Sequence, residues 1–228
     1  MLPVIAGLLF TMTLLFAPQL WVKYVLKKYS TPLPQLPGSG GELAEHLLGR
    51  LGFADTKTIL TEQGDHYDPA ERSVCLSEST FHDKSLTAVV IAAHEVGHAI
   101  QHHNSYKPML VRAYLARCIG PAEKLAGFIL ISSPFAALLS KQPLLGGLML
   151  LSGMVLLFLP VVFHLITLPV EWDASFNRAL PILMQGQYLP ADSEPIVRRI
   201  LTAATLTYLS ASLFSLLNFY RWLVFLRR

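Results

Sequence analysis

Charged residues are scarce in this sequence. They make up 14% of the 228 residues, whereas hydrophobic residues make up 53% and the mean hydropathy is +0.47. Soluble domains have about 25% charged residues, so this composition excludes an ordinary soluble domain and indicates that much of the chain contacts membrane lipid. The formal net charge of +3 is small and spread along the chain. It gives no indication of a nucleic-acid partner.

Cysteine is also scarce, because the chain contains only Cys75 and Cys118. Two thiols are too few for a disulfide framework, and they are compatible with a reducing compartment. We expect both to pack as small buried hydrophobic side chains. The sequence has no internal repeat of the solenoid type, and nothing in it indicates an oligomeric state.

Long apolar runs are what the sequence does contain. Residues 3–22 are uncharged and about long enough to cross a bilayer, and without a basic start or a small-residue cleavage site they predict an uncleaved anchor. Residues 125–139 and 144–170 are apolar runs on either side of the polar segment 140–143, which predicts a transmembrane hairpin. Residues 200–220 are a fourth, less hydrophobic candidate.

The segments between the first two membrane elements have a different pattern. After a linker rich in Pro and Gly, they predict two helices and two strands, so the fold is expected to be a mainly α-helical polytopic membrane protein with a small β-sheet. The expected elements are a linker at 31–41, a helix at 42–53, a strand at 56–60, a turn-like segment at 62–72, a strand at 73–77 and a helix from about Ser85 to beyond Gln101.

The last of these helices carries the pattern His94-Glu95-Val96-Gly97-His98. Residues four apart lie on one face of a helix, so the two imidazoles can share one zinc ion. Glu95 projects beside that face, where a carboxylate can act as general base toward a metal-bound water. The apolar stretch 86–93 favours a buried metal site, because polar side chains buried there need partners. Gly97 suggests the close approach of another backbone.

The third metal ligand is not decided by this motif. In the metzincin pattern it would be a histidine six residues after His98, but that position is Asn104, so this class is excluded. His102 lies one turn further along the same straight helix, too far from a metal that His94 binds. The remaining candidates are glutamates in other segments: Glu123, Glu171 and Glu194.

Four segments together carry a family resemblance. GDHYDP at 64–69, VCLS at 74–77, AAHEVGHAIQH at 92–102 and LPVEWDAS at 168–175 resemble the YugP-like neutral zinc metallopeptidases of bacterial membranes, over nearly the whole chain. The resemblance implies zinc bound by the two histidines of the motif, Glu95 as the catalytic carboxylate and Glu171 as the third ligand. The predicted hairpin is consistent with Glu171, because it returns the chain to the face of the motif.

Two further residues follow from the same comparison. In better-known peptidases with a glutamate ligand, an Asp four residues after that glutamate orients a ligand histidine, whereas this sequence has Ser175 there. Asp173 is therefore expected to orient a ligand imidazole. Arg178, one turn further along, is a candidate for contact with the substrate or the oxyanion, with a structural salt bridge as the alternative.

The strand at 73–77 suggests where a substrate binds. Zinc peptidases commonly hold an extended peptide against an exposed sheet edge, and this strand comes shortly before the metal-binding helix. The sequence therefore predicts a substrate-binding edge at Val74, Cys75 and Leu76. The alternative is a small sheet that only covers the helix.

These observations divide the chain into six segments. They are an anchor at 1–22, a linker at 23–41, a zincin-like catalytic segment at 42–124, the hairpin at 125–170, a third-ligand helix and connecting segment at 171–199 and a C-terminal transmembrane or membrane-associated helix at 200–228. Lys23, Lys27 and Lys28 follow the anchor, so the positive-inside rule predicts a multi-pass protein of the inner (plasma) membrane with a cytoplasmic catalytic face. The arginines near the C-terminus argue for the opposite orientation.

The function predicted from the sequence is a membrane-embedded endopeptidase with one zinc ion per chain, acting on a peptide or protein substrate. The first alternative is a catalytically silent membrane scaffold with a structural zinc site. Such a site usually has four protein ligands, often with Cys, whereas this motif offers three ligands and an open position. The second alternative is a zinc hydrolase that acts on a bond other than a peptide bond.

Overall fold

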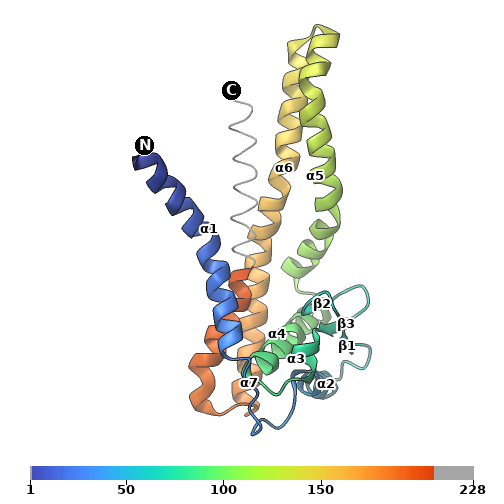
Figure 1. Cartoon of the computed structure of the whole chain (residues 1–228). Coiled ribbons are helices and arrows are strands. Elements are labelled where there is room, and N and C mark those ends of the chain that lie inside the picture. Colours follow the sequence, from blue (N-terminus) through green and yellow to red (C-terminus); the bar gives the residue numbers. More distant parts are fainter. Residues whose placement is uncertain (1, 208–228) are drawn as a thin grey trace.

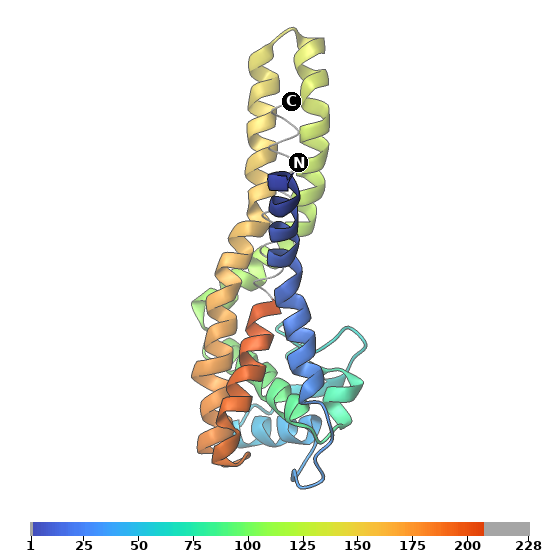
Figure 2. The ribbon, with the colours of Figure 1, turned by 60° about the vertical axis from the view of Figure 1, so that its left-hand side comes forward.

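The computed structural model describes residues 2–207. Within them the chain is mainly helical with one three-stranded sheet, as predicted. A long hairpin of two helices rises from a compact part that contains the sheet and the shorter helices (Figure 1). The first helix extends from the compact part in the same direction as the hairpin (Figure 2). The predicted return of the chain by way of a hairpin is therefore present.

The hairpin consists of α5 (Lys107–Ser140) and α6 (Pro143–Trp172). By length and composition, two described helices can cross a membrane: α5, and the continuous helical stretch Pro143–Gln185 that begins with α6. Helix α5 begins well before residue 125, where the hairpin was predicted to start. Its first part therefore belongs to the predicted catalytic segment, which is thus continuous with the first arm of the hairpin.

Helix α1 (Leu2–Lys28) contains the predicted anchor and extends beyond it. Val22 and Val25 near its end are buried in the main core, and the hydroxyl of Thr87 donates a hydrogen bond to the Leu26 carbonyl. The end of α1 is thus packed against the compact part, although the linker was predicted to begin at residue 23. That α1 is a membrane anchor stays a prediction.

The compact part is built around α4 (Leu86–His103), whose residues are almost all buried as far as Gln101. The apolar residues at 86–93 bury this helix, and Ser85 caps its start by accepting a hydrogen bond from the Ala88 amide. Helix α2 (Gly40–Leu51) packs on α4 and begins with a capping box formed by Ser39 and Glu42. The short helix α3 (Glu78–His82) lies between the sheet and α4 in the sequence.

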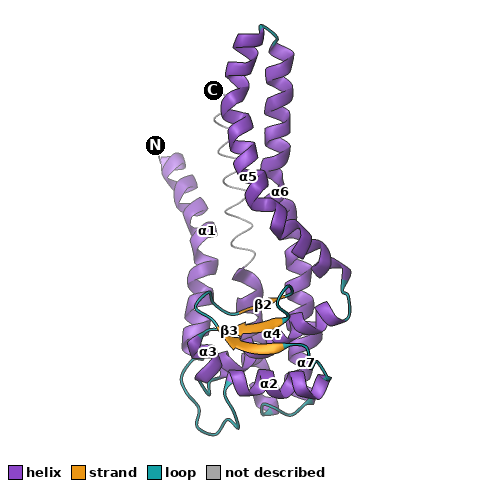
Figure 3. Ribbon diagram, turned by 90° about the vertical axis from the view of Figure 1, so that its right-hand side faces the viewer, coloured by secondary structure: helices purple, strands orange, loops and turns teal. Residues whose placement is uncertain are grey.

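The sheet has the strand order β1-β3-β2, with β1 at Lys57–Leu60, β2 at His66–Asp68 and β3 at Ser73–Leu76 (Figure 3). Strand β3 pairs with β1 in parallel and with β2 antiparallel, so both of its edges are used. The predicted substrate-binding edge at Val74, Cys75 and Leu76 is therefore wrong, because these residues form the buried centre of the sheet. Strand β2 lies in the segment that was predicted to be turn-like.

Beyond α6 the chain forms a π-helix, η1 (Asp173–Ala179), followed by α7 (Leu180–Gln185) and the 3₁₀-helix η2 (Ala191–Ser193). A helix at 194–207 then packs against the core through Val197, Ile200 and Leu201. Most of the predicted C-terminal segment at 200–228 lies outside the described residues.

Candidate metal centre

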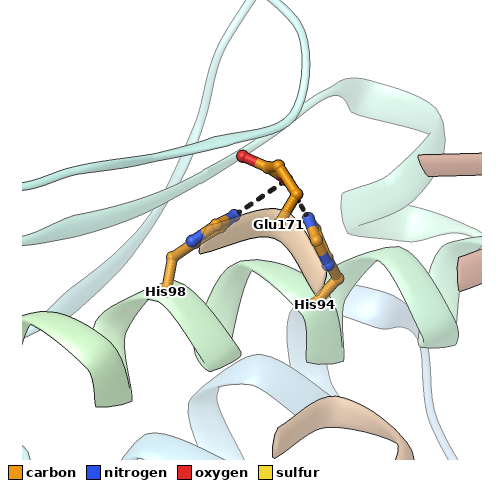
Figure 4. A group of neighbouring side chains, drawn as sticks. All are labelled: His94, His98 and Glu171. Atoms are coloured by element: carbon orange, nitrogen blue, oxygen red, sulfur yellow. Dashed lines mark hydrogen bonds and ion pairs between the residues drawn. The ribbon is translucent and has the colours of Figure 1, made fainter. Parts of the chain in front are cut away.

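His94 and His98 of α4 and Glu171 of the last turn of α6 point toward one another (Figure 4). The Nε2 atoms of His94 and His98 lie 3.1 Å and 3.3 Å from Oε2 of Glu171. The three possible ligand atoms lie within 4.8 Å of one another, and all three side chains are buried. Two imidazoles and a carboxylate at this spacing could hold a metal ion.

Gln101 determines which nitrogen of His98 carries a proton. The Gln101 side-chain amide donates hydrogen bonds to the carbonyl oxygen of Val170 and to Oδ2 of Asp173, both at 2.8 Å. Because both partners are acceptors, the orientation of the Gln101 amide is fixed. Its oxygen faces Nδ1 of His98 at 2.9 Å and can only accept. Nδ1 of His98 therefore carries the proton, and in the neutral ring Nε2 presents a lone pair to Glu171.

A second chain of hydrogen bonds orients His94. The hydroxyl of Thr205 donates to the Leu201 carbonyl, so its oxygen is left to accept from Ser175. The Ser175 oxygen lies 3.0 Å from Nδ1 of His94 and accepts the proton that this nitrogen carries. Nε2 of His94 consequently presents a lone pair to Glu171 as well.

Three acceptors thus face one another in a buried space: two nitrogen lone pairs and a carboxylate oxygen. Without a cation between them, such an arrangement is repulsive. The alternative is two protonated imidazolium rings, which would bury two positive charges against the single carboxylate of Glu171. A divalent cation resolves the repulsion with neutral rings, so the residues fit a metal of the zinc type.

The other two glutamates proposed from the sequence are not part of this group. Glu123 is exposed on α5, and Glu194 forms an ion pair with Arg198, at a distance of 2.8 Å between Nε and Oε1. Of the three candidates, only Glu171 is in contact with His94 and His98.

Asp173 does not have the predicted role, whereas Arg178 has the structural one of its two predicted roles. Asp173 does not contact an imidazole; it accepts hydrogen bonds from Gln101 and Asn177, and from Nε of Arg178 at 2.8 Å. It therefore acts on His98 only by way of Gln101. Arg178 is held by this ion pair and by Tyr106, whose ring centroid lies 5.9 Å from the guanidinium carbon. This is the structural alternative that the sequence left open for Arg178.

Glu95 is buried next to the three-residue group, with 6% of its surface exposed. Burial raises the pKa of its carboxyl to about 7, against a smaller opposing effect of His94. A carboxyl that exchanges a proton near neutral pH has the property that a general base requires.

Arg112 brings a positive charge from α5 to the same place. Its Nη1 lies 3.3 Å from Oε1 of Glu171, the carboxylate oxygen that faces away from the histidines. Glu171 can therefore offer Oε2 to a metal while Oε1 faces the guanidinium. This contact also connects the first arm of the hairpin with the second at the level of the site.

Comparison with known proteins agrees with this geometry. Residues 4–227 match the family described as "Putative neutral zinc metallopeptidase". The chain belongs to this family of neutral zinc metallopeptidases. It is 35% identical over 212 residues to the Bacillus subtilis (strain 168) protein named "Putative membrane protease YugP", an alignment that covers 92% of this chain and 90% of that protein. No solved structure matches the chain.

The family and the structure together give a consistent outline. The predicted family resemblance is confirmed, and the chain has a His/His/Glu group suited to the metal that gives the family its name. The name of the relative and the two long apolar helices both point to an association with the membrane.

The sequence analysis did not predict the contacts that four residues make in or beside this group: Gln101, Ser175, Thr205 and Arg112. Gln101 lies one helical turn after His98, which is a usable signal for a partner of that ring. Asp was the residue expected at the position of Ser175, and the Ser175 hydroxyl reaches His94 there. Thr205 and Arg112 belong to helices whose packing on α4 and α6 has no local signal.

We expect Gln101→Met to lower zinc affinity by about 10- to 100-fold, because it leaves Nδ1 of His98 without its acceptor. Asp173→Ala is the matched comparison. Asp173 contacts Gln101 and not the ring, so its loss is expected to cost less than about tenfold. Zinc titration of both variants measures the two losses of affinity. An equal loss in Gln101→Met and Asp173→Ala would contradict the expectation.

Gly97 lets α4 approach η1 closely, as its place in the motif suggested. A Cβ atom at this position would lie 2.7 Å from the carbonyl oxygen of Ala174, which is closer than real Cβ contacts. The histidines lie on α4 and Glu171 directly precedes η1, so this close approach determines the separation of the three ligand candidates.

Gly97→Ala is therefore expected to destabilise the protein by about 1–3 kcal/mol and to weaken zinc binding, because α4 and η1 must move apart. Gly49→Ala on α2 is the control, since an added Cβ there meets nothing within 4 Å. It should leave zinc affinity unchanged and stabilise α2 by up to about 1 kcal/mol. Thermal unfolding and zinc titration of both variants distinguish a local clash from a general effect of alanine.

Proposed function

We propose that this chain is a zinc-dependent endopeptidase of the membrane. The single observation that carries the proposal is the arrangement of three acceptors, in which Nε2 of His94, Nε2 of His98 and Oε2 of Glu171 converge without a donor among them. These atoms would hold one zinc ion per chain. The family match supports zinc and peptide hydrolysis, and the hydrogen-bond chains supply the physical reason for the fit.

Zinc bound by this group would supply the Lewis acidity that activates water and polarises the scissile carbonyl. Glu95 then takes a proton from the attacking water and delivers it to the leaving amine. Its burial suits this task, because a carboxyl shielded from solvent exchanges protons with the reacting groups. Arg112 holds Oε1 of Glu171 and keeps a positive charge close to the reacting carbonyl.

An extended substrate would pair with β2. Because β3 is central, the outer edges of the described sheet belong to β1 and β2. The Tyr67 hydroxyl of β2 lies 2.8 Å from Nδ1 of His102, which places this strand along the C-terminal half of the catalytic helix. A peptide added to β2 would receive main-chain hydrogen bonds while it passes the metal group.

The function is tested by incubating the purified full-length chain with an unbiased peptide library, with and without a zinc chelator. We expect cleavage of internal peptide bonds that the chelator abolishes and added zinc restores. The Glu95→Gln protein, purified in the same way, controls for contaminating peptidases. Zinc bound without any cleavage would support the structural scaffold instead, and hydrolysis of ester or amide probes alone would support a non-peptide hydrolase.

We further propose a multi-pass arrangement in the plasma membrane with the catalytic part on the cytoplasmic side. Helix α1 and the hairpin extend from the compact part in the same direction, so one bilayer can accommodate all three (Figure 1). Lys23, Lys27 and Lys28 lie at the end of α1 next to the compact part and support this orientation.

A single cysteine placed in the loop at 31–39 tests the orientation. In a background with Cys75 and Cys118 replaced by Ser, we expect this thiol to resist a membrane-impermeant reagent in intact cells and to react after lysis. A cysteine at Lys141, in the hairpin turn, is the control and should react in intact cells. The reverse pattern would place the catalytic part outside.

A further inference from the structure

Helix α6 places the metal group, which consists of His94, His98 and Glu171, close to the membrane. The helix has 30 residues, so it is about 45 Å long at ~1.5 Å per residue. A bilayer measures about 30 Å across its hydrocarbon core and about 40–45 Å with its headgroups. Glu171 lies in the last turn of α6, at the end opposite to the hairpin turn. The metal group is therefore at most about one bilayer thickness from that turn.

The hairpin turn sets the limit on how far Glu171 can stand from the lipid. Lys141 and Gln142 in the turn are exposed and polar, so they need the headgroup layer or water on the far side. If they reach only the far headgroups, Glu171 lies in the near headgroup layer. A turn that extends further into water would draw Glu171 closer to the hydrocarbon core, and a tilted helix would do the same.

The exposed side chains near Glu171 also indicate that this residue lies at the depth of the near headgroup layer. The apolar side chains that α6 exposes continue to Leu165, which is 63% exposed and about 9 Å before Glu171 at ~1.5 Å per residue. Trp172 follows Glu171 and is 56% exposed. An exposed Trp is typical of the headgroup level. Polar residues of η1 begin directly afterwards.

We propose that the metal centre acts on juxtamembrane peptide bonds, in segments of membrane proteins that have just left the bilayer on the catalytic side. This inference rests on the proposed peptidase function and names its substrate class. A substrate anchored in the same bilayer brings its first extramembrane residues to the depth of Glu171. A peptide bond held far above the lipid cannot reach the group, because the membrane fixes the height of α6.

The test uses two reporters that differ only in the height of one cleavable cassette, whose sequence is the one cut best in the peptide library. Each has a single membrane-spanning helix. In the first the cassette follows that helix directly, and in the second a rigid helical spacer of four EAAAK repeats raises it by about 30 Å. Each reporter is reconstituted with the full-length chain and zinc in vesicles of equal parts phosphatidylcholine and phosphatidylglycerol. The Glu95→Gln chain and the free cassette peptide are controls.

In vesicles we expect the low cassette to be cut at least about tenfold faster than the raised one, since the spacer holds the latter out of reach. In detergent micelles, which impose no common plane, the two rates should agree within about twofold. Equal cutting in vesicles, with the free peptide also cut, would overturn the inference and leave the peptidase function intact. Failure to cut any of the three would overturn both.

Discussion

Glu95→Gln should retain zinc and lose peptide hydrolysis by about 10²- to 10⁴-fold, as is typical when a general base is removed. The substitution keeps the size of the side chain and leaves His94, His98 and Glu171 in place. Glutamine cannot take a proton from water, so the chemical step is the one affected. Zinc content by metal analysis and the cleavage rate of the best library peptide measure the two effects separately.

A control for this result lies in the same buried environment. Ser175→Ala removes the partner of Nδ1 of His94, so it should weaken zinc binding while leaving Glu95 intact. At saturating zinc its cleavage rate should be much closer to that of the unchanged protein than the rate of Glu95→Gln. If Glu95→Gln cleaved at nearly the original rate, Glu95 would not be the base.

The second large effect is expected at Glu171. At free zinc about 100 times above Kd, binding to the native state stabilises a protein by about 2.7 kcal/mol, and Glu171→Ala should lose most of this gain. The loss should appear in the packing of the hairpin on the compact part, because Glu171 connects α6 to the two histidines of α4. Glu171→Gln, which keeps the side-chain volume, separates the loss of the carboxylate from the loss of packing.

Glu123→Ala is the matched control for Glu171→Ala, because Glu123 is an exposed glutamate on the other arm of the same hairpin. It should keep zinc affinity and the zinc-dependent stabilisation nearly unchanged. Zinc titration and thermal unfolding in detergent, with and without the metal, measure both quantities. Full affinity in Glu171→Ala would remove Glu171 from the ligand set.

The sequence was a good guide wherever the signal is local. The helical spacing of His94 and His98, the caps of α2 and α4 and the apolar runs of the hairpin each follow from neighbouring residues. The group formed with Glu171 was also anticipated, but by family resemblance and not by spacing. Among three candidate glutamates, the residues alone offered no decision.

The features that could not be predicted from the sequence depend on contacts between residues far apart in the chain. Which strand lies at the centre of the sheet depends on strand order, and β2 is too short and too polar to be recognised, so β3 was placed at an edge. The hydrogen-bond partners of the Nδ1 atoms come from α4 itself and from η1. The helix at 194–207 supplies Thr205, which contacts Ser175 and not a ring. Asp173 was assigned directly to a ring because the intervening Gln101 is visible only in three dimensions.

The separation of the ligand candidates along the chain has a consequence for biosynthesis. Glu171 comes 77 residues after His94, with the whole hairpin between them. During translation the two histidines leave the ribosome first, and the chain has no complete ligand set until α5 and most of α6 have been made. Only after α6 has returned to α4 do the three side chains meet. If the chain has the proposed activity, that activity is therefore expected only after the hairpin has been made and has folded back onto α4.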